Sequence, residues 1–321
     1  MWTAYWTTSP GTGELRTERG RAPGEGEALV RTLRSGVSRG TETLVHSGSV
    51  PPEIADLMRA PFQAGALPGP IKYGYLSVGV VEDGPADLVG RRVFALHPHQ
   101  DRYVVPVDAL TPVPDDVPSD RAVLAGNVET AVNVLWDAAP RLGDRIAVVG
   151  AGMVGGLVAA LARTFPLGRL QLVDVDPARA DLARALGVEL VHPDDAAGEC
   201  DLVVHCSASE DGLARGLDLL GDEGELVEVS WYGTRVPRVP LGGAFHARRL
   251  TIRASQVGAV AAARRARRTT ADRLALAMRT LDDPVFDAFL TGRSRFADLP
   301  QTMDSLAAGE GSPLCHVIAY P

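Results

Sequence analysis

The stretch that decides the fold runs from Asp144 to Asp176 and reads DRIAVVGAGMVGGLVAALARTFPLGRLQLVDVD. It opens on the apolar run 146–149, which is too short for a helix and is typical of a strand buried on both faces. An apolar segment of helical length, 153–165, follows and is stopped by Pro166. A second apolar run, 170–173, comes next. The order strand, helix, strand predicts a βαβ unit of a parallel sheet.

Three glycines, Gly150, Gly152 and Gly155, stand between the first run and the helical segment in the spacing G-x-G-x-x-G. In a dinucleotide site the first makes a tight turn, the second lets the backbone approach a pyrophosphate, and the third lets the helix pack close to the strand. The helix N-terminus adds oriented N–H groups for the phosphates. This context predicts a dinucleotide site. The alternative is a Rossmann-like domain for another adenosine ligand, such as a methyl donor.

Asp174 ends the second apolar run, nineteen residues after Gly155. A carboxylate there accepts hydrogen bonds from the adenosine ribose hydroxyls and repels a 2′-phosphate, so NAD is favoured over NADP. Arg179, five residues further on, could help to hold such a phosphate. NADP therefore stays open as the less favoured cofactor.

Two further loops are expected to line the cofactor, because ligands of doubly wound sheets bind at the carboxyl ends of the strands. One loop follows the predicted strand 201–205 and the other follows 225–229. The second loop also carries Trp231 and Tyr232, which we expect to bound the substrate pocket. The expected cofactor residues from the motif and these loops are Gly150, Gly152, Met153, Val154, Gly155, Asp174, Val175, Arg179, Cys206, Ser207, Ala208 and Ser230.

Composition limits the classes of protein. The chain has 321 residues, 45% apolar and 22% charged, which suits two globular domains with real cores. The formal net charge of -8 argues against a nucleic-acid partner. No apolar run is long enough to span a membrane and no leader pattern opens the chain, so we expect a cytoplasmic protein. The three cysteines form no C-x-x-C pair, so disulfides and a cysteine-rich zinc lobe are not expected.

The first hundred residues differ from the middle of the chain. Short β-like runs at 28–33, 77–81, 92–96 and 102–105 predict an antiparallel, partly barrel-like domain. The segment 51–70, with a short helix expected at 53–59, is more typical of a surface or lid loop. The final segment ends in an expected strand, 315–320, that returns to the first domain. The resulting domains are 1–121 with 285–321, and 122–284.

From residue 145 onward, strands and helices alternate, which predicts an α/β fold with a doubly wound parallel sheet. A helical region, 119–139, precedes this alternation. A run of four arginines between 264 and 268 is expected to lie on a solvated helix start. The expected elements are 145–149, 153–165, 169–173, 178–186, 201–206, 210–220, 225–230, 249–254 and 261–281.

Over essentially its whole length the chain resembles the medium-chain dehydrogenase/reductase superfamily. Besides the glycine motif, the resemblance rests on SGVSRGTE at 35–42, KYGYLSVGVV at 72–81 and NVETA at 127–131. It implies a GroES-like β-rich catalytic domain beside a Rossmann domain, with Thr130 near the cofactor. The first motif looks closest to a zinc-free branch that includes the bacteriochlorophyllide a dehydrogenase type. The segment after 254 often pairs subunits in this family, which implies a homodimer.

Zinc-using members of the family carry a cysteine, a Gly-His-Glu and a second cysteine in the three motifs. The matching positions here are Ser38, Tyr75 with Leu76, and Asn127. A catalytic zinc needs three protein ligands of Cys, His or carboxylate type, so the resemblance implies a metal-free site. Hydrogen-bond donors must then polarise the substrate oxygen, and a side chain must relay the proton.

The candidates for that chemistry lie in the motifs that the resemblance assigns to the active site, together with the cluster His97-Pro98-His99. A histidine has a pKa suited to acid–base work at neutral pH. We expect catalytic roles for Ser38, Thr41, Tyr75 and His99. We expect substrate contacts from Glu42, His97, Glu129, Trp231 and Tyr232. His205, His246 and His316 are expected to be structural.

These observations predict an NAD(H)-dependent, zinc-independent oxidoreductase that moves a hydride between nicotinamide and a secondary alcohol or ketone. The loop 51–70 and the pair Trp231-Tyr232 hint at a fairly large, cyclic substrate. Reduction of an activated C=C bond is a second possibility, since it needs only oxyanion stabilisation and a proton donor. A nucleotide-binding protein without turnover is the alternative from another class.

Overall fold

The structure is a computed structural model that describes residues 1–311 and 313–321. The chain divides into two compact units, which are described separately. Unit 1 comprises Met1–Gly126 and Ala277–Pro321, and unit 2 comprises Asn127–Leu276. Within the described residues, no helix combines the length and the apolar character needed to cross a bilayer.

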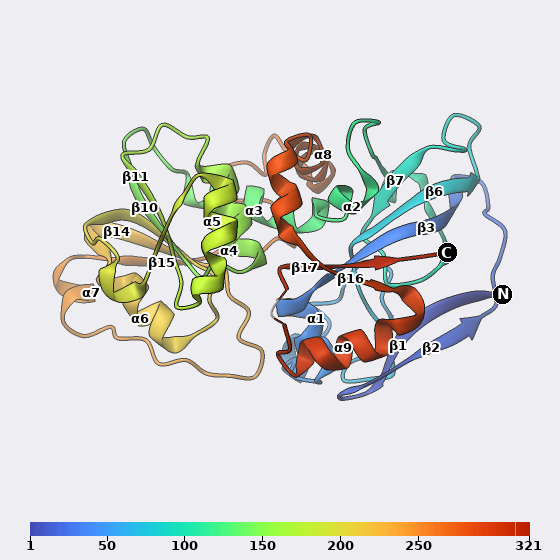
Figure 1. Ribbon diagram of the computed structural model, residues 1–321, viewed down its shortest axis with the longest axis horizontal. Coiled ribbons are helices and arrows are strands. Elements are labelled where there is room, and N and C mark those ends of the chain that lie inside the picture. The colour runs from blue at the N-terminus through green and yellow to red at the C-terminus, as the bar shows by residue number, and fades with distance from the viewer. Residues whose placement is uncertain (312) are drawn as a thin grey trace. The chain divides into compact units, whose positions relative to one another are not determined.

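Unit 2 is built on a six-stranded sheet in which every pair of neighbours is parallel (Figure 1). The strand order is β12-β11-β10-β13-β14-β15, so the chain leaves β10 in one direction and later returns to its other side. The carboxyl ends of β10 and β13 flank this reversal, where doubly wound sheets bind ligands. The strands are β10 (Arg145–Val149), β11 (Arg169–Val173), β12 (Glu189–Val191), β13 (Cys200–His205), β14 (Leu220–Glu228) and β15 (Thr251–Ala254).

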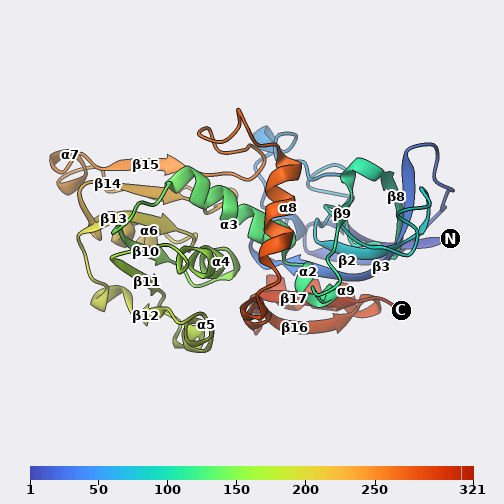
Figure 2. The same ribbon diagram turned by 90° about the horizontal axis from the view of Figure 1, so that it is seen from above.

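Helices cover this sheet and close its core. Helices α4 and α5 contact each other beside β10, β11 and β12, and α6 packs on β10, β13 and β14 (Figure 2). The core between them is apolar, with Val149, Val203 and Leu226 fully or almost fully buried. The helices are α3 (Ala125–Ala138), α4 (Met153–Ala162), α5 (Ala180–Leu186), α6 (Glu210–Asp218), α7 (Ala244–Ala247) and α8 (Thr270–Thr280), with 3₁₀ turns η3 (Pro177–Arg179) and η4 (Pro193–Asp195).

The expected helix 261–281 is wrong at its start, because α8 begins only at Thr270. Thr269 and Asp272 form a reciprocal cap: the Asp272 N–H donates to Thr269 Oγ1 at 3.1 Å, and the Thr269 N–H donates to Asp272 Oδ2 at 2.9 Å. The arginine run 264–268 therefore lies before the helix, in a turn that ends at Arg267.

Unit 1 holds two sheets. The larger one has the order β16-β17-β3-β6-β7-β9, with β8 also paired to β3, and the smaller one has the order β2-β1-β5-β4. Strand β17 runs antiparallel to β3, so the C-terminal segment completes the sheet begun near the N-terminus. The strands are β1 (Trp2–Ser9), β2 (Thr12–Glu18), β3 (Glu27–Ser38), β4 (Ala64–Gly65), β5 (Ile71–Lys72), β6 (Ser77–Asp83), β7 (Arg92–Ala95), β8 (Arg102–Pro106), β9 (Thr111–Pro112), β16 (Leu290–Arg295) and β17 (Cys315–Ala319).

Short helices complete unit 1. Helix α9 packs through Leu299, Met303 and Leu306 into a core that includes Tyr5 and Ile318. The short helix expected at 53–59 is instead the 3₁₀ turn η1 followed by turns. The elements are α1 (Arg39–His46), α2 (Ser119–Ala122), α9 (Leu299–Ala307), η1 (Pro52–Ile54), η2 (Val107–Ala109), η5 (Pro284–Phe289) and η6 (Phe296–Asp298).

Candidate cofactor and catalytic sites

The glycine turn of unit 2 has the geometry that a dinucleotide site needs. Gly150 has a φ of +102°, and a Cβ there would lie 2.7 Å from the backbone nitrogen of Ser207. A Cβ on Gly155 would overlap the carbonyl oxygen of Gly150, so helix α4 packs tightly on the turn. A Cβ on Gly152 would meet no atom of the described residues within 4 Å. The backbone at Gly152 is therefore open to a pyrophosphate, while the other two glycines are required by packing.

Helix α4 begins directly after this turn, and no side chain caps its N-terminus at Gly152. The first backbone N–H groups of an uncapped helix favour an anion. Met153 and Val154, the expected phosphate contacts, are the first two residues of the helix. The turn and the helix end thus form a fitting cradle for the cofactor phosphates.

Asp174 follows β11, and its carboxylate accepts from the backbone N–H of Ala151 at 2.6 Å and of Asp176 at 2.9 Å. The carboxylate is therefore fixed beside the glycine turn, where it can accept from a ribose hydroxyl. The neighbouring Val175 is 70% exposed. Arg179 forms an ion pair with Asp176 at 3.3 Å. This ion pair partly neutralises the charge that a 2′-phosphate would need.

The two loops after β13 and β14 meet at the same edge of the sheet. The N–H of Ala208 donates to Ser230 Oγ at 3.0 Å, and the N–H of Cys206 donates to the carbonyl of Val149 at 2.8 Å. Burial raises the pKa of the Cys206 thiol, and the charge of Glu228 raises it further, so this cysteine is a neutral thiol at physiological pH.

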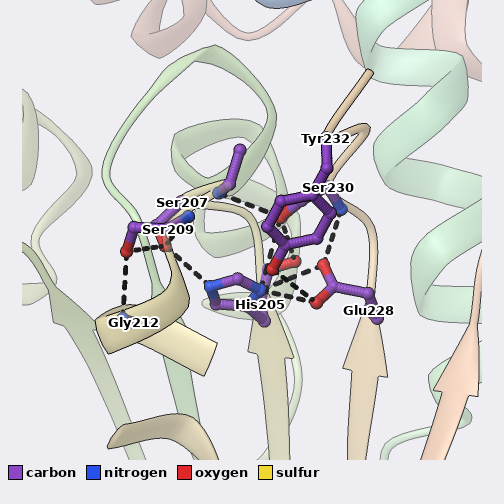
Figure 3. Close-up of polar contacts among 8 residues, drawn as sticks. His205, Ser207, Ser209, Gly212, Glu228, Ser230 and Tyr232 are labelled. Atoms are coloured by element: carbon purple, nitrogen blue, oxygen red, sulfur yellow. Dashed lines mark hydrogen bonds and ion pairs between the residues drawn. The ribbon is translucent and has the colours of Figure 1, made fainter. Parts of the chain in front are cut away.

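Sequence reasoning missed a polar cluster between these loops. His205, expected to be only structural, bonds Ser207 on one side and Glu228 on the other, and Tyr232 also bonds Glu228 (Figure 3). His205 and Glu228 are the last residues of β13 and β14. Their position at the carboxyl ends of neighbouring parallel strands was the signal that could have found them.

In unit 1 the structure joins four buried side chains, two of them expected at the active site, in one chain of hydrogen bonds. Glu42 of α1 contacts His99 Nε2 at 2.8 Å, and His99 Nδ1 contacts Ser35 Oγ at 2.7 Å. Ser35 Oγ lies 3.0 Å from the hydroxyl of Tyr320. The other oxygen of Glu42 accepts from the backbone N–H of Ser38 at 2.8 Å. His99 and Glu42 are 1% and 3% exposed.

The hydrogen positions along this chain follow from its carboxylate end. With Glu42 accepting, His99 Nε2 donates; in the tautomer with its proton on Nε2, Nδ1 accepts from Ser35, whose oxygen then accepts from Tyr320. Burial raises the pKa of the Tyr320 phenol, so Tyr320 keeps its proton. Ser38, at the end of β3, is joined to His99 through Glu42.

His97 lies outside this series of hydrogen bonds. Its ring stacks on Tyr103 at 3.7 Å and on Phe62 at 5.6 Å, and Nδ1 donates to the carbonyl of Pro98 at 3.0 Å. Burial lowers the pKa of His97 to about 3. The ring is therefore neutral at physiological pH and cannot donate a proton as an imidazolium.

The remaining expected residues are dispersed over the two units. Thr41 lies in α1 and is partly exposed. Tyr75 precedes β6, partly buried, with its ring edge-on to Tyr73 at 6.2 Å. Trp231 is partly buried, and among the described residues its indole nitrogen has no hydrogen-bond partner. Thr130 is partly buried in α3.

Glu129, expected at the substrate, pairs with Arg273 at 3.0 Å, and both side chains are buried. Arg273 also donates to Asn133 Oδ1 and to the carbonyl of Val257 at 2.5 Å each. Burial raises the pKa of Glu129, and the charge of Arg273 opposes that shift. The observed contacts of Glu129 hold α3 to α8, and its substrate contact stays a prediction.

Comparisons with known proteins were made on the whole chain. No family model matches it. The chain is 24% identical over 168 residues to D-xylulose reductase A of Aspergillus oryzae, covering 46% of this chain and 47% of that protein. It is also 29% identical over 136 residues to L-threonine 3-dehydrogenase of Anaeromyxobacter dehalogenans, covering 41% and 39%. The chain thus spans less than half the length of these curated relatives.

The solved structures match over nearly the full chain. L-idonate 5-dehydrogenase of Escherichia coli K-12 has a TM-score of 0.81 at 15% identity, covering 99% of this chain and 98% of that one. 2R,3R-butanediol dehydrogenase of Bacillus subtilis has a TM-score of 0.79 at 15% identity and covers 99% of both chains. The fold is therefore the two-domain fold of the medium-chain dehydrogenases, which confirms the expected GroES-like and Rossmann architecture.

The donor set does not suit the zinc that this fold often carries. The positions that match zinc ligands hold Ser38, Tyr75 with Leu76, and Asn127, and Leu76 is a core side chain with no exposed surface. None of these side chains is a thiolate, an imidazole or a carboxylate. Among the described residues, no group of three or more His, Cys, Asp and Glu side chains could hold a metal ion.

Proposed function

We propose that this chain is an NAD(H)-dependent oxidoreductase that transfers a hydride between nicotinamide and a secondary alcohol or ketone. The observation that carries the proposal is the glycine turn, with its open backbone at Gly152 and the fixed carboxylate of Asp174 beside it. When bound, the cofactor would accept or supply the hydride. The medium-chain dehydrogenase fold and the names of the relatives, a reductase and two dehydrogenases, support this class of reaction.

The cofactor would be held by unit 2. Met153 and Val154 would donate backbone N–H groups to the phosphates, and Asp174 would accept from the adenosine ribose. The exposed apolar Val175 and the pairing of Arg179 with Asp176 favour NAD over NADP. The loops 206–208 and 230–232 would take the nicotinamide half.

The reaction would proceed without zinc, because the positions that match zinc ligands hold residues of the wrong type. Hydrogen-bond donors of unit 1, Ser38, Thr41 and Tyr75, would then polarise the substrate oxygen. His99, for which a catalytic role is expected, is 1% exposed and contacts Glu42, so we propose that it acts on the site indirectly, by orienting Glu42 and through it the backbone of Ser38.

The proposed substrate is larger than ethanol and carries a cyclic, apolar part. The segment 51–70 presents two exposed apolar side chains in unit 1, Leu57 at 83% and Phe62 at 40% exposure. In unit 2, Trp231 offers a buried indole N–H that donates to no group among the residues that the structure describes. The protein would act in the cytoplasm as a homodimer, for which the edge strand β15, whose four residues are all exposed, is the candidate surface.

The test is calorimetric titration of the purified protein with NADH and then with NADPH, with metal content measured on the same sample. We expect NADH to bind more tightly than NADPH and zinc to be absent at stoichiometric level. Failure of both nucleotides to bind would overturn the proposal. Tight NADPH binding would overturn the Asp174 argument, and one bound zinc per chain would overturn the metal-free mechanism.

A further inference from the structure

The polar cluster at the edge of the unit 2 sheet joins two loops through one carboxylate (Figure 3). Glu228 contacts His205 Nδ1 at 2.8 Å through one oxygen and 2.9 Å through the other. It also accepts from the hydroxyl of Tyr232 at 3.2 Å and from the backbone N–H of Ser230 at 2.8 Å. On its other side, His205 Nε2 lies 2.6 Å from Ser207 Oγ.

The direction of these hydrogen bonds follows from the carboxylate of Glu228, which only accepts. His205 Nδ1 therefore donates to Glu228, and in the tautomer with its proton on Nδ1 the ring accepts at Nε2 from Ser207. Because the single Ser207 proton is used there, the 3.0 Å contact between the two serine hydroxyls is made by the proton of Ser209, whose own oxygen accepts from Gly212 N–H at 2.9 Å. Burial works to raise the pKa of Glu228, but the hydrogen bonds from His205 and Ser230 outweigh it and lower the pKa. Glu228 is therefore an anion that only accepts.

The order Ser207, His205, Glu228 is also the order that activates a nucleophilic hydroxyl in hydrolases. Here the Ser207 oxygen already accepts from the hydroxyl of Ser209 and from its N–H at 3.2 Å. A Cβ on Gly212 would collide with this oxygen, so α6 covers it closely. The hydroxyl already makes three hydrogen bonds and lies close against α6, which suits a structural link rather than attack on a substrate.

We infer that Glu228 is a positioning residue that locks the loops 206–208 and 230–232 into one rigid wall for the nicotinamide half of the cofactor. The inference rests on the proposed function. Through His205 the carboxylate fixes Ser207, and through its direct bonds it fixes Ser230 and Tyr232. The adenosine half depends mainly on other groups: among the described residues Asp174 and the glycine turn make no hydrogen bond to the side chains of this cluster, and the turn meets the loop 206–208 only where Gly150 packs against the backbone of Ser207.

If the two halves of the cofactor depend on different groups, loss of Glu228 should weaken the binding of NADH but not that of ADP. ADP carries the adenosine and both phosphates but no nicotinamide riboside, so it reports on the glycine turn and Asp174 alone. In Glu228→Ala, we expect calorimetry to show NADH binding weakened about tenfold, equivalent to about 1.4 kcal/mol. We expect the ADP affinity to change less than about twofold.

A conservative variant shows whether the hydrogen bonds of Glu228 or its negative charge matters for NADH binding. In Glu228→Gln, the amide can donate to His205 Nδ1. The imidazole then carries its proton on Nε2 and donates it to Ser207, so both loops stay linked. We expect this variant to recover most of the NADH affinity. Glu225→Ala is the matched control, because Glu225 lies on the same strand and pairs with Arg253, away from both loops. It should leave both affinities unchanged.

Three results would overturn the inference: an unchanged NADH affinity in Glu228→Ala, an equal loss for NADH and ADP, or no recovery in Glu228→Gln. If Glu228→Ala does not fold, Tyr232→Phe removes only one bond to the carboxylate and should weaken NADH about threefold with ADP unaffected. An unchanged NADH affinity there would also count against the inference. If the wild type binds neither NADH nor ADP, the proposed function itself fails.

Discussion

Each unit contains a histidine held between a glutamate and a serine, but the two arrangements end differently. The unit 1 chain runs from Glu42 through His99 and Ser35 to the buried Tyr320. The unit 2 cluster runs from Glu228 through His205 to Ser207 and then to the exposed Ser209. Glu42 has a side chain 3% exposed, whereas that of Glu228 is 16% exposed. The same Glu–His–Ser arrangement thus lies in the buried core of unit 1 and links two surface loops in unit 2.

The largest expected effect on stability comes from removing Glu42, the carboxylate of the buried hydrogen bonds in unit 1. Glu42→Ala leaves two buried donors, His99 Nε2–H and the Ser38 N–H, without partners, at about 1–3 kcal/mol each. We expect the free energy of unfolding to fall by about 4 kcal/mol, measured by chemical denaturation. Glu228→Ala should cost about half as much, because water reaches that carboxylate. Equal losses would show that the difference in exposure carries no energetic weight.

His97 should give unit 1 a pH dependence that the two networks do not explain. Its pKa is about 3 when folded and about 6.5 when unfolded, because burial disfavours the charged ring. Below pH 6.5 the unfolded chain therefore binds a proton that the folded chain does not, and stability falls as the pH drops toward 3. His97→Phe, which keeps a ring against Tyr103, should flatten the stability curve between pH 6 and pH 4. A slope identical to that of wild type would contradict this assignment.

The smallest effect on stability is expected at Tyr320, the last residue in the buried hydrogen bonds of unit 1. Tyr320→Phe removes one neutral hydrogen bond to Ser35 and leaves the stacking of the ring on Phe296 in place. We expect a loss of about 1 kcal/mol in the free energy of unfolding. Thermal melting beside the Glu42→Ala variant gives the ranking directly. A loss as large as that of Glu42→Ala would mean that the terminal hydroxyl, not the carboxylate, organises the chain.

The fold of unit 2 could be predicted closely because its sequence signals are local. The strand, the three glycines, the helix and Asp174 follow one another within 144–176, and the structure has β10, α4 and β11 there. The strands near 28–33, 77–81 and 92–96 were also predicted, since each is an apolar run bounded by turn residues. Cofactor roles for individual residues stay predictions.

The missed features depend on contacts between residues far apart in the chain. The hairpin β1–β2 and the segment of β16 and α9 carry weak local patterns and are stabilised by partners such as β5 and β17. His205 and Glu228 are brought together by the parallel pairing of β13 with β14. Glu42 and His99 are 57 positions apart, and only the folded sheet makes them neighbours.

The close approach of Gly150 to Ser207 limits how unit 2 can evolve. Any side chain at 150 would need the loop 206–208 to move, and that loop is tied through His205 to Glu228. A substitution at one of these positions therefore changes the fitness effect of substitutions at the others. Engineering that grafts a new glycine turn onto this chain, for instance to alter cofactor preference, would have to graft both strand ends with it.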